Sequence, residues 1–330
     1  MKNNIRSMSD MNLDDYINQL EEIQKNGYNE TKTGFDLLDE KFSAGGLTKG
    51  QLIILAARPS MGKSVFSQNL AENIGKRKTV LFFSLEMTYK EIVDRIVCHK
   101  ANIDMSKLKQ KGGMKTDEFA RFVSVIPELK ETLLHMTDAS CQTVDTIKKI
   151  TTEYLEEIKK TGLETGLIII DHLSLISTKG SKAATKNEAI GEITGALKAF
   201  AKDIGIPILL ISQLNRNSTS RVNNKPQLSD LRDSGSIEQD ADIVLAIHRE
   251  EIYSDKPDLK GLAELIILKN RDGELGNIMM KFNGSRFNFS EFKSNDSNRF
   301  SNDLVVETVE TVETVENQSG FKIIHAECPF

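Results

Sequence analysis

A short apolar run that ends in a tight turn and a helix, at residues 51–76, constrains the fold of this chain most. The run QLIILAA has the length and composition of a buried strand, and VFSQNLAENIGK after the turn has the pattern of an amphipathic helix. The turn between them ends in Gly62, Lys63 and Ser64. A strand, a glycine-containing turn and a helix in this order form the framework of a phosphate-binding loop. The sequence therefore predicts an α/β domain with a mostly parallel central sheet.

The residue types in this turn suit a polyphosphate and a metal ion. Backbone N–H groups at a helix start converge on an anion, and the helix dipole favours negative charge there. Lys63 is expected to reach the β- and γ-phosphates, and the Ser64 hydroxyl to bind Mg²⁺. A chance surface turn is the alternative for this motif taken alone. The residues expected to bind ATP are Ala57, where the usual pattern has glycine, and Arg58, Pro59, Ser60, Met61, Gly62, Lys63, Ser64 and Val65.

Three further apolar runs lead to polar side chains that could take part in catalysis or binding. TVLFFSL leads to Glu86, LIIID ends at Asp171, and PILLISQ ends at Gln213. The carboxyl ends of parallel strands meet at the edge of a sheet where ligands bind. There Asp171 can organise Mg²⁺ (or, as the alternative, cap a helix), Glu86 can act as general base, and Gln213 can sense the γ-phosphate. This order of elements describes a RecA-like ATPase core.

An arginine that could complete the site stands far along the chain. Arg271 follows the apolar run LAELIILKN, and Lys269 alternates with it, so both side chains can leave the strand end on the same side. Arg271 is the obvious donor to the site of a neighbouring subunit. A donor in trans requires a ring or a filament.

Composition limits the other function classes. The chain has 330 residues, a formal net charge of −5 and three cysteines without a paired spacing. The charge argues against a surface coated for nucleic-acid binding, so any DNA contact is expected to be local. The N-terminus has no apolar core of a signal peptide, and no apolar run approaches the ~20 residues of a membrane span. We therefore predict a cytoplasmic protein that does not enter a membrane.

One local contact of this kind is expected around residues 229–240. This stretch has Ser-Gly-Ser at its centre, with Ser234 and Gly235 able to present bare backbone N–H groups. Such groups can hold a phosphate backbone without reading bases.

The two ends of the chain are expected to lie apart from the ATPase core. Residues 12–24 carry an apolar stripe at helical spacing, which either packs on its own domain or docks as an arm on a neighbouring subunit. The C-terminal residues repeat VET, are acidic and low in complexity, and are predicted to be disordered. We expect an N-terminal arm at 1–30, the ATPase domain at 31–293, and a tail with an apolar terminus at 294–330.

The motifs ARPSMGKS, FFSLEM, LIIIDHLSLI, PILLISQLNR, LSDLRDSGSIEQDADIVL and ILKNRDG, in this order, resemble the ATPase domain of DnaB-family replicative helicases. The resemblance implies a homohexameric ring that moves 5′ to 3′ on single-stranded DNA and hydrolyses ATP with Mg²⁺. It also implies that Glu86 is the catalytic base and that Lys269 and Arg271 act in trans. It places Arg232, Asp233 and Gly235 in the loop that holds DNA, and the helix at 12–24 on the next subunit.

Two departures from the family pattern affect the expected partners. Asp233 stands where the family usually has Glu, and too few residues precede Thr33 to form the family's N-terminal helical domain. We therefore expect a core-only version, for which a phage source is one explanation, with a helicase loader, primase or single-strand-binding protein as candidate partners. The alternatives are a RecA-like recombinase and a truncated subunit that modulates a host replicative helicase.

Overall fold

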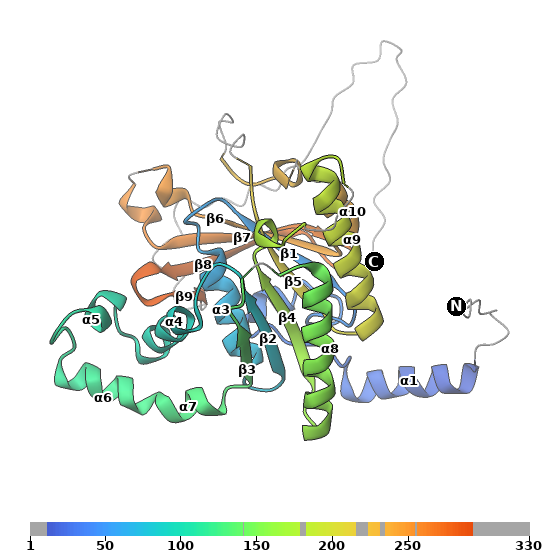
Figure 1. Cartoon of the computed structure of the whole chain (residues 1–330), viewed down its shortest axis with the longest axis horizontal. Helices are drawn as coiled ribbons and strands as arrows, with labels where there is room; N and C mark the ends of the chain where they lie inside the picture. The colour runs from blue at the N-terminus through green and yellow to red at the C-terminus, as the bar shows by residue number, and fades with distance from the viewer. Residues whose placement is uncertain are drawn as a thin grey trace, which may run out of the picture. The chain divides into compact units, whose positions relative to one another are not determined.

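The computed structural model describes residues 12–140, 142–178, 183–215, 224–231, 235–254 and 256–292. The predicted disordered tail at 294–330 lies outside the described residues. Within them, nine strands form one sheet in the order β3-β2-β4-β5-β1-β6-β7-β8-β9 (Figure 1). The strands are β1 (Leu52–Ala57), β2 (Thr79–Ser84), β3 (Leu134–Thr137), β4 (Thr165–Asp171), β5 (Ile208–Gln213), β6 (Ile243–His248), β7 (Leu262–Asn270), β8 (Gly276–Asn283) and β9 (Asn288–Glu291).

The first six strands in this order are parallel to one another, and the last three join antiparallel, so the prediction of a mostly parallel sheet is confirmed. β1 lies at the centre, between β5 and β6. Its register aligns Ala57 with Gln213 on one side and with Ile247 on the other. The carboxyl ends of these strands therefore meet at one edge of the sheet.

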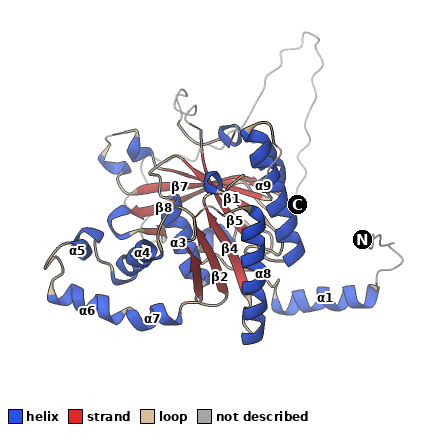
Figure 2. Ribbon diagram, in the orientation of Figure 1, coloured by secondary structure: helices blue, strands red, loops and turns tan. Residues whose placement is uncertain are grey.

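Helices cover both faces of the sheet (Figure 2). Residues alternate between two apolar cores, because successive side chains of a strand point to opposite faces: Ile53 and Leu55 enter one core, Leu52 and Ile54 the other. The helices are α1 (Leu13–Asn26), α2 (Asp36–Asp39), α3 (Lys63–Ile74), α4 (Tyr89–Ala101), α5 (Met105–Lys109), α6 (Thr116–Ser124), α7 (Ile126–Glu131), α8 (Val144–Thr161), α9 (Lys186–Ile204) and α10 (Gly235–Asp240).

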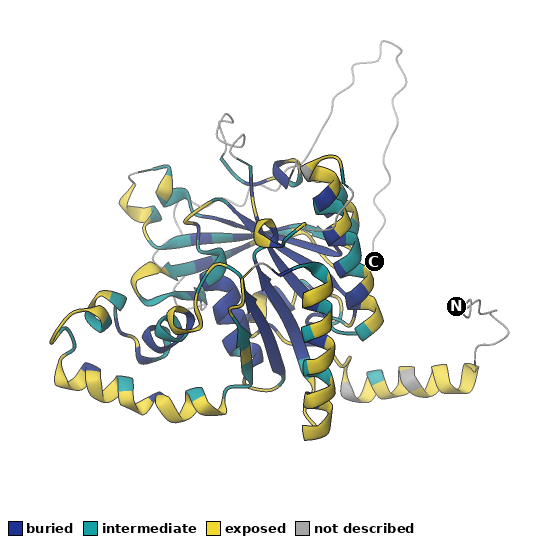
Figure 3. Ribbon diagram, viewed as in Figure 1, coloured by how far each residue is buried: buried dark blue, intermediate teal, exposed yellow. Residues whose placement is uncertain are grey.

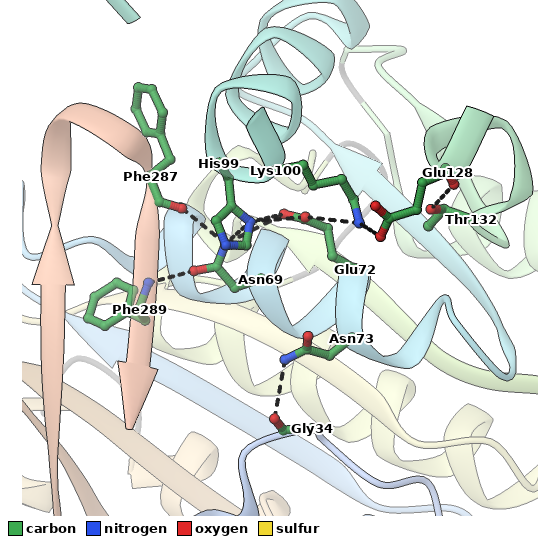
Figure 4. Close-up of polar contacts among 10 residues, drawn as sticks. All are labelled: Gly34, Asn69, Glu72, Asn73, His99, Lys100, Glu128, Thr132, Phe287 and Phe289. Atoms are coloured by element: carbon green, nitrogen blue, oxygen red, sulfur yellow. Dashed lines mark hydrogen bonds and ion pairs between the residues drawn. The ribbon is translucent and has the colours of Figure 1, made fainter. Parts of the chain in front are cut away.

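The helix after the phosphate-binding turn, α3, is not amphipathic, so that expectation is wrong. Nine of its residues are buried, polar ones included. Figure 4 shows why: Asn69 donates to the carbonyl of Phe287 at 3.0 Å and accepts from the Phe289 N–H at 2.8 Å, while Glu72 contacts His99 of α4 at 3.0 Å. These partners lie far away in the sequence, and they turn a face that reads as solvated into an internal one.

β8 and β9 form a hairpin whose connection is longer than two residues. β8 and β9 pair as far as Asn283 and Asn288, and the turn between them is the 3-10 segment Gly284–Arg286. The Asn283 side chain closes this turn by accepting from the Arg286 N–H at 3.2 Å.

Most of the N-terminal helix α1 is exposed, as the burial colours of the ribbon in Figure 3 show, and its apolar stripe is exposed with it. Leu13, Tyr16, Ile17 and Leu20 are between 42% and 64% exposed, which is unusual for large apolar side chains on one helix face. Among the described residues, no helix combines the length and the apolar character that a membrane span needs.

Candidate nucleotide-binding site

The turn between β1 and α3 has the backbone of a phosphate-binding loop. β1 ends at Ala57, which is fully buried, and α3 starts at Lys63. Ser60 and Gly62 have positive φ angles of 65° and 102°. A Cβ atom on Gly62 would lie 2.9 Å from the ring of Phe289, so only glycine fits there.

Lys63 points back over this turn. Its Nζ atom lies 3.3 Å from the carbonyl oxygen of Ala57 and 3.4 Å from that of Arg58. Burial lowers the pKa of Lys63, and the charges of Asp171 and Glu86 act in the opposite direction. The ammonium group therefore stands among the loop carbonyls, close to both carboxylates.

Asp171, at the end of β4, fits a role as metal-organising acid. Its side chain is buried, and its Oδ1 atom is buried without a hydrogen bond. Burial raises the pKa of Asp171, and the nearby Ser64 hydroxyl partly offsets this effect. A hydroxyl beside an uncompensated carboxylate oxygen is the donor set that Mg²⁺ uses together with phosphates and water.

Glu86 lies two residues beyond β2, beside Asp171. The strands β2 and β4 align Ser84 with Asp171, and the Leu85 N–H donates to the Asp171 carbonyl at 2.7 Å. The Glu86 carboxylate is 57% exposed and lies 3.5 Å from Nε2 of His172, whose Nδ1 lies 2.8 Å from the Ser174 hydroxyl. A solvent-facing carboxylate at this edge is able to contact a water molecule.

Gln213 completes this group of side chains. It is the last residue of β5, aligned with Ala57, and its side chain is exposed. The next residue, Leu214, donates its N–H to the Ala57 carbonyl at 3.0 Å. The fold thus brings five predicted residues to one edge of the sheet: Lys63, Ser64, Glu86, Asp171 and Gln213.

Sequence reasoning missed two arginines, one that contacts the loop and one whose charge interacts with the carboxylates. Arg249, directly after β6, donates to the Ser60 carbonyl at 2.9 Å and lies over the Phe282 ring. Arg95, on α4, lies over the Phe287 ring. Burial lowers the pKa of Arg95, while the nearby negative charges, Asp171 and Glu86 among them, act in the opposite direction.

Arg58 has a contact of its own beside the loop. Its guanidinium donates to the Tyr253 hydroxyl at 2.8 Å. This contact joins the loop to the segment after β6. The spacing of these residues carries no motif, so only their packing reveals them.

Lys269 and Arg271 lie at the opposite edge of the sheet. β7 runs antiparallel to β6, so its end aligns with the beginning of β6, and the Arg271 N–H donates to the Asp242 carbonyl at 2.9 Å. The loop lies beyond the other end of β1, a distance of about 20 Å for a six-residue strand. Neither cation can serve the phosphate loop of its own chain.

The segment expected to hold DNA is only partly described. Arg232, Asp233 and Ser234 lie outside the described residues, and Gly235 is the first residue of α10. No cluster of three or more His, Cys, Asp or Glu side chains suited to a metal ion occurs in the described part of the chain. A metal ion at this edge would therefore depend on Ser64, Asp171 and the phosphates themselves.

A parallel sheet with a phosphate loop after its central strand, and acidic residues after two neighbouring strands, defines a RecA-like ATPase domain. The model of the DnaB-like helicase C terminal domain family matches residues 31–291, and the chain belongs to this family. The replicative DNA helicase DnaB of Buchnera aphidicola subsp. Baizongia pistaciae is 40% identical over 299 residues. That of Pasteurella multocida is 38% identical over 290 residues.

These curated relatives are longer than the chain. The matches cover 89% and 85% of this chain but 63% and 59% of the two relatives. A solved ATPase domain superimposes with a TM-score of 0.78 at 28% identity, covering 85% of this chain and 98% of that domain. A DnaB-like replicative helicase, solved in a study of its interactions with primase, gives 0.77 at 27% identity, covering 88% of this chain and 68% of that one.

Proposed function

We propose that this chain is the ATP-hydrolysing motor of a replicative DNA helicase, a homohexameric ring that moves 5′ to 3′ on single-stranded DNA and unwinds the duplex at the replication fork. Its family membership supports this function over a recombinase or a modulating subunit. One observation supports assembly into a ring. Five groups of the site lie at one edge of the sheet, while Lys269 and Arg271 lie at the other. A complete site then needs two subunits in head-to-tail order.

Each residue has a separate task in this proposal. The turn from Ala57 to Val65 encloses the phosphates, and Lys63 balances their charge. Ser64 and Asp171 hold Mg²⁺, which supplies charge neutralisation on the phosphate oxygens when it is bound. Glu86 accepts a proton from the attacking water. The alignment of β2 and β4 holds Glu86 near Asp171.

The remaining groups report on the γ-phosphate or stabilise it. Gln213 senses the γ-phosphate from the end of β5, beside Ala57. Arg95 adds positive charge on the same subunit, near both carboxylates. Lys269 and Arg271 of the preceding subunit stabilise charge in the transition state, as a finger in trans does.

The DNA is held by the segment from Arg232 to Gly235, with Asp233 and Ser234 between them, through backbone contacts. Primase is a candidate partner because one structural relative is described together with primase interactions. A loader and a single-strand-binding protein are further candidates, and ATP and DNA as substrates suit a cytoplasmic location.

The chemical assignment is tested by ATP hydrolysis with and without single-stranded DNA. We expect Glu86→Gln to bind ATP and DNA but to turn over about 10²–10⁴-fold more slowly, because the proton acceptor is lost. Lys63→Ala should lose both ATP hydrolysis and ATP binding. Glu153→Gln, an exposed change on α8, is the matched control and should behave as the unchanged chain. Robust hydrolysis by Glu86→Gln would assign the base elsewhere.

A further inference from the structure

A buried carboxylate stands at the sheet edge opposite the phosphate loop. Asp242 precedes β6, and its side chain is 6% exposed. Its Oδ2 atom accepts from the Leu52 N–H at 2.8 Å and from Nζ of Lys198 at 2.6 Å. Its Oδ1 atom accepts from the guanidinium of Arg271 at 3.0 Å. One side chain thus joins the start of β1, the helix α9 and the arginine proposed to act in trans.

The companion cation is held by the same region. Lys269 donates from Nζ to the carbonyl oxygens of Glu238 and Ala241, at 2.5 and 2.6 Å. The first belongs to the last turn of α10 and the second follows the helix end, where carbonyl groups lack partners within the helix. The pairing of β6 and β7 shifts register here, with Val244 opposite Lys269 and Leu245 opposite Ile267. A bulge of this kind bends the strand and changes the direction in which the side chains at its end point.

The short helix α10 precedes Asp242 and supplies one of the two carbonyl groups that hold Lys269. It begins at Gly235, directly after residues 232–234, and ends two residues before Asp242. It packs against α9 with little free space, since a Cβ atom on Gly191 would lie 2.8 Å from Oγ of Ser236. Thr194 donates to Oδ2 of Asp240 at 2.5 Å. Contacts at both its start and its end therefore hold α10 in one position on α9.

We propose that Asp242 is a positioning residue, which orients Arg271 toward the ATP site of the next subunit. This inference rests on the proposed function, since it needs a site shared between subunits. Arg271 is 53% exposed, so its outer end is available to a neighbour while Asp242 fixes the inner side. An arginine held in this way loses less freedom when it meets a phosphate.

The test mixes two defective subunits of the full-length protein. Asp242→Asn keeps its own phosphate loop intact but presents a poorly oriented arginine, and Lys63→Ala lacks its loop function but presents a correct one. Asp242→Asn alone should hydrolyse ATP at least about tenfold more slowly than the unchanged chain, with ATP binding retained. In an equal mixture, about a quarter of the interfaces combine a working loop with a correct arginine, so activity should rise to about a quarter of normal.

Two further variants separate positioning from folding. Asp242→Asn combined with Lys198→Gln removes the buried carboxylate together with the half-buried lysine paired with it. The double variant therefore leaves no unpaired lysine and gives the same mixing test if the single change fails to fold. Glu274→Gln removes an exposed carboxylate paired with Lys41 and should leave hydrolysis unchanged. Adding Asp242→Asn to Arg271→Ala should not lower the rate of ATP hydrolysis further, because both changes remove the same contribution of an oriented Arg271.

The outcomes distinguish this inference from the function on which it rests. Recovery in the mixture supports it. If the unchanged chain hydrolyses ATP with DNA and the mixture stays at or below half the rate of Asp242→Asn, Asp242 acts within its own subunit and the inference is wrong. If the unchanged chain hydrolyses no ATP, the proposed function fails and this inference fails with it.

Discussion

At the scale of single residues, Asp171 combines a carboxylate with a buried position. Burial raises its pKa in the folded protein above the value of an unfolded chain. The folded state then holds the proton more tightly, so stability declines as the pH rises from the unfolded value through the folded one. The cost of the buried charge is therefore larger at neutral pH than at acidic pH. In our account, the metal ion that this carboxylate organises offsets that cost.

We expect Asp171→Asn to melt higher than the unchanged chain at neutral pH without nucleotide, by about 2–4 °C for each 1 kcal/mol relieved. The difference should shrink as the pH falls, because the wild-type carboxyl then binds its proton. Thermal melts over a pH series measure it. Stabilisation by ATP with Mg²⁺ should disappear in the variant. A variant that melts lower at neutral pH would contradict this account of Asp171.

The principal site residues could be predicted because each stands directly after an apolar strand pattern. Asp171 and Gln213 end such runs, and parallel strands place their ends together. Arg249 could not be predicted, since its partner Ser60 lies 189 residues away and no spacing rule connects them. Its position depends on the pairing of β1 with β6, which is a tertiary feature.

At the scale of elements, α3 shows where a local pattern fails. Gln68, Asn69 and Glu72 read as a solvent-facing side of the helix, but all three are buried. Gln68 contacts Met87, which lies between β2 and α4. The partners of Asn69 and Glu72 come from the β8–β9 turn and from α4, respectively (Figure 4). The existence and order of the strands follow from composition and period, whereas the environment of a helix depends on neighbours that the sequence does not reveal locally.

This buried face makes a prediction about the stability of the element. We expect Asn69→Ala to lower the free energy of unfolding by about 1–3 kcal/mol, because it leaves the Phe289 N–H and the Phe287 carbonyl without their partner. Asn73→Ala, four residues along the same helix, removes only a 3.5 Å contact with the Gly34 carbonyl and should cost less than about 0.5 kcal/mol. Denaturant unfolding measures both. Equal losses in the free energy of unfolding would mean that the two hydrogen bonds of Asn69 to the β8–β9 hairpin do not stabilise the fold.

At the scale of the whole molecule, the account depends on assembly. The exposed stripe of α1 is the arm that we propose to dock on the next subunit, and α6 offers an exposed apolar face that includes Phe119 at 54% and Val123 at 47%. Large apolar side chains in such groups mark interaction sites. A ring built in this way would bring Arg271 of one subunit to the Lys63 edge of the next.

We expect Ile17→Asp to abolish the hexamer without unfolding the monomer, because Ile17 is 51% exposed in the single chain. Analytical ultracentrifugation measures the assembly, and a thermal melt checks the fold. Asn18→Asp adds the same charge at an exposed position on the other side of α1 from the apolar stripe and should leave the ring intact. A hexamer that survives Ile17→Asp would rule out this face of α1 as the arm.

The central claim is that this chain is a motor that unwinds DNA from a 5′ single-stranded tail. Strand displacement on forked duplexes with ATP and Mg²⁺ tests it most directly, with Lys63→Ala as the inactive control. We predict displacement that requires the 5′ tail, is absent with a 3′ tail alone, and disappears in the control. Displacement that is independent of the 5′ tail or that persists in Lys63→Ala, or no displacement in spite of ATP hydrolysis stimulated by single-stranded DNA, would contradict the claim that this chain alone is a helicase.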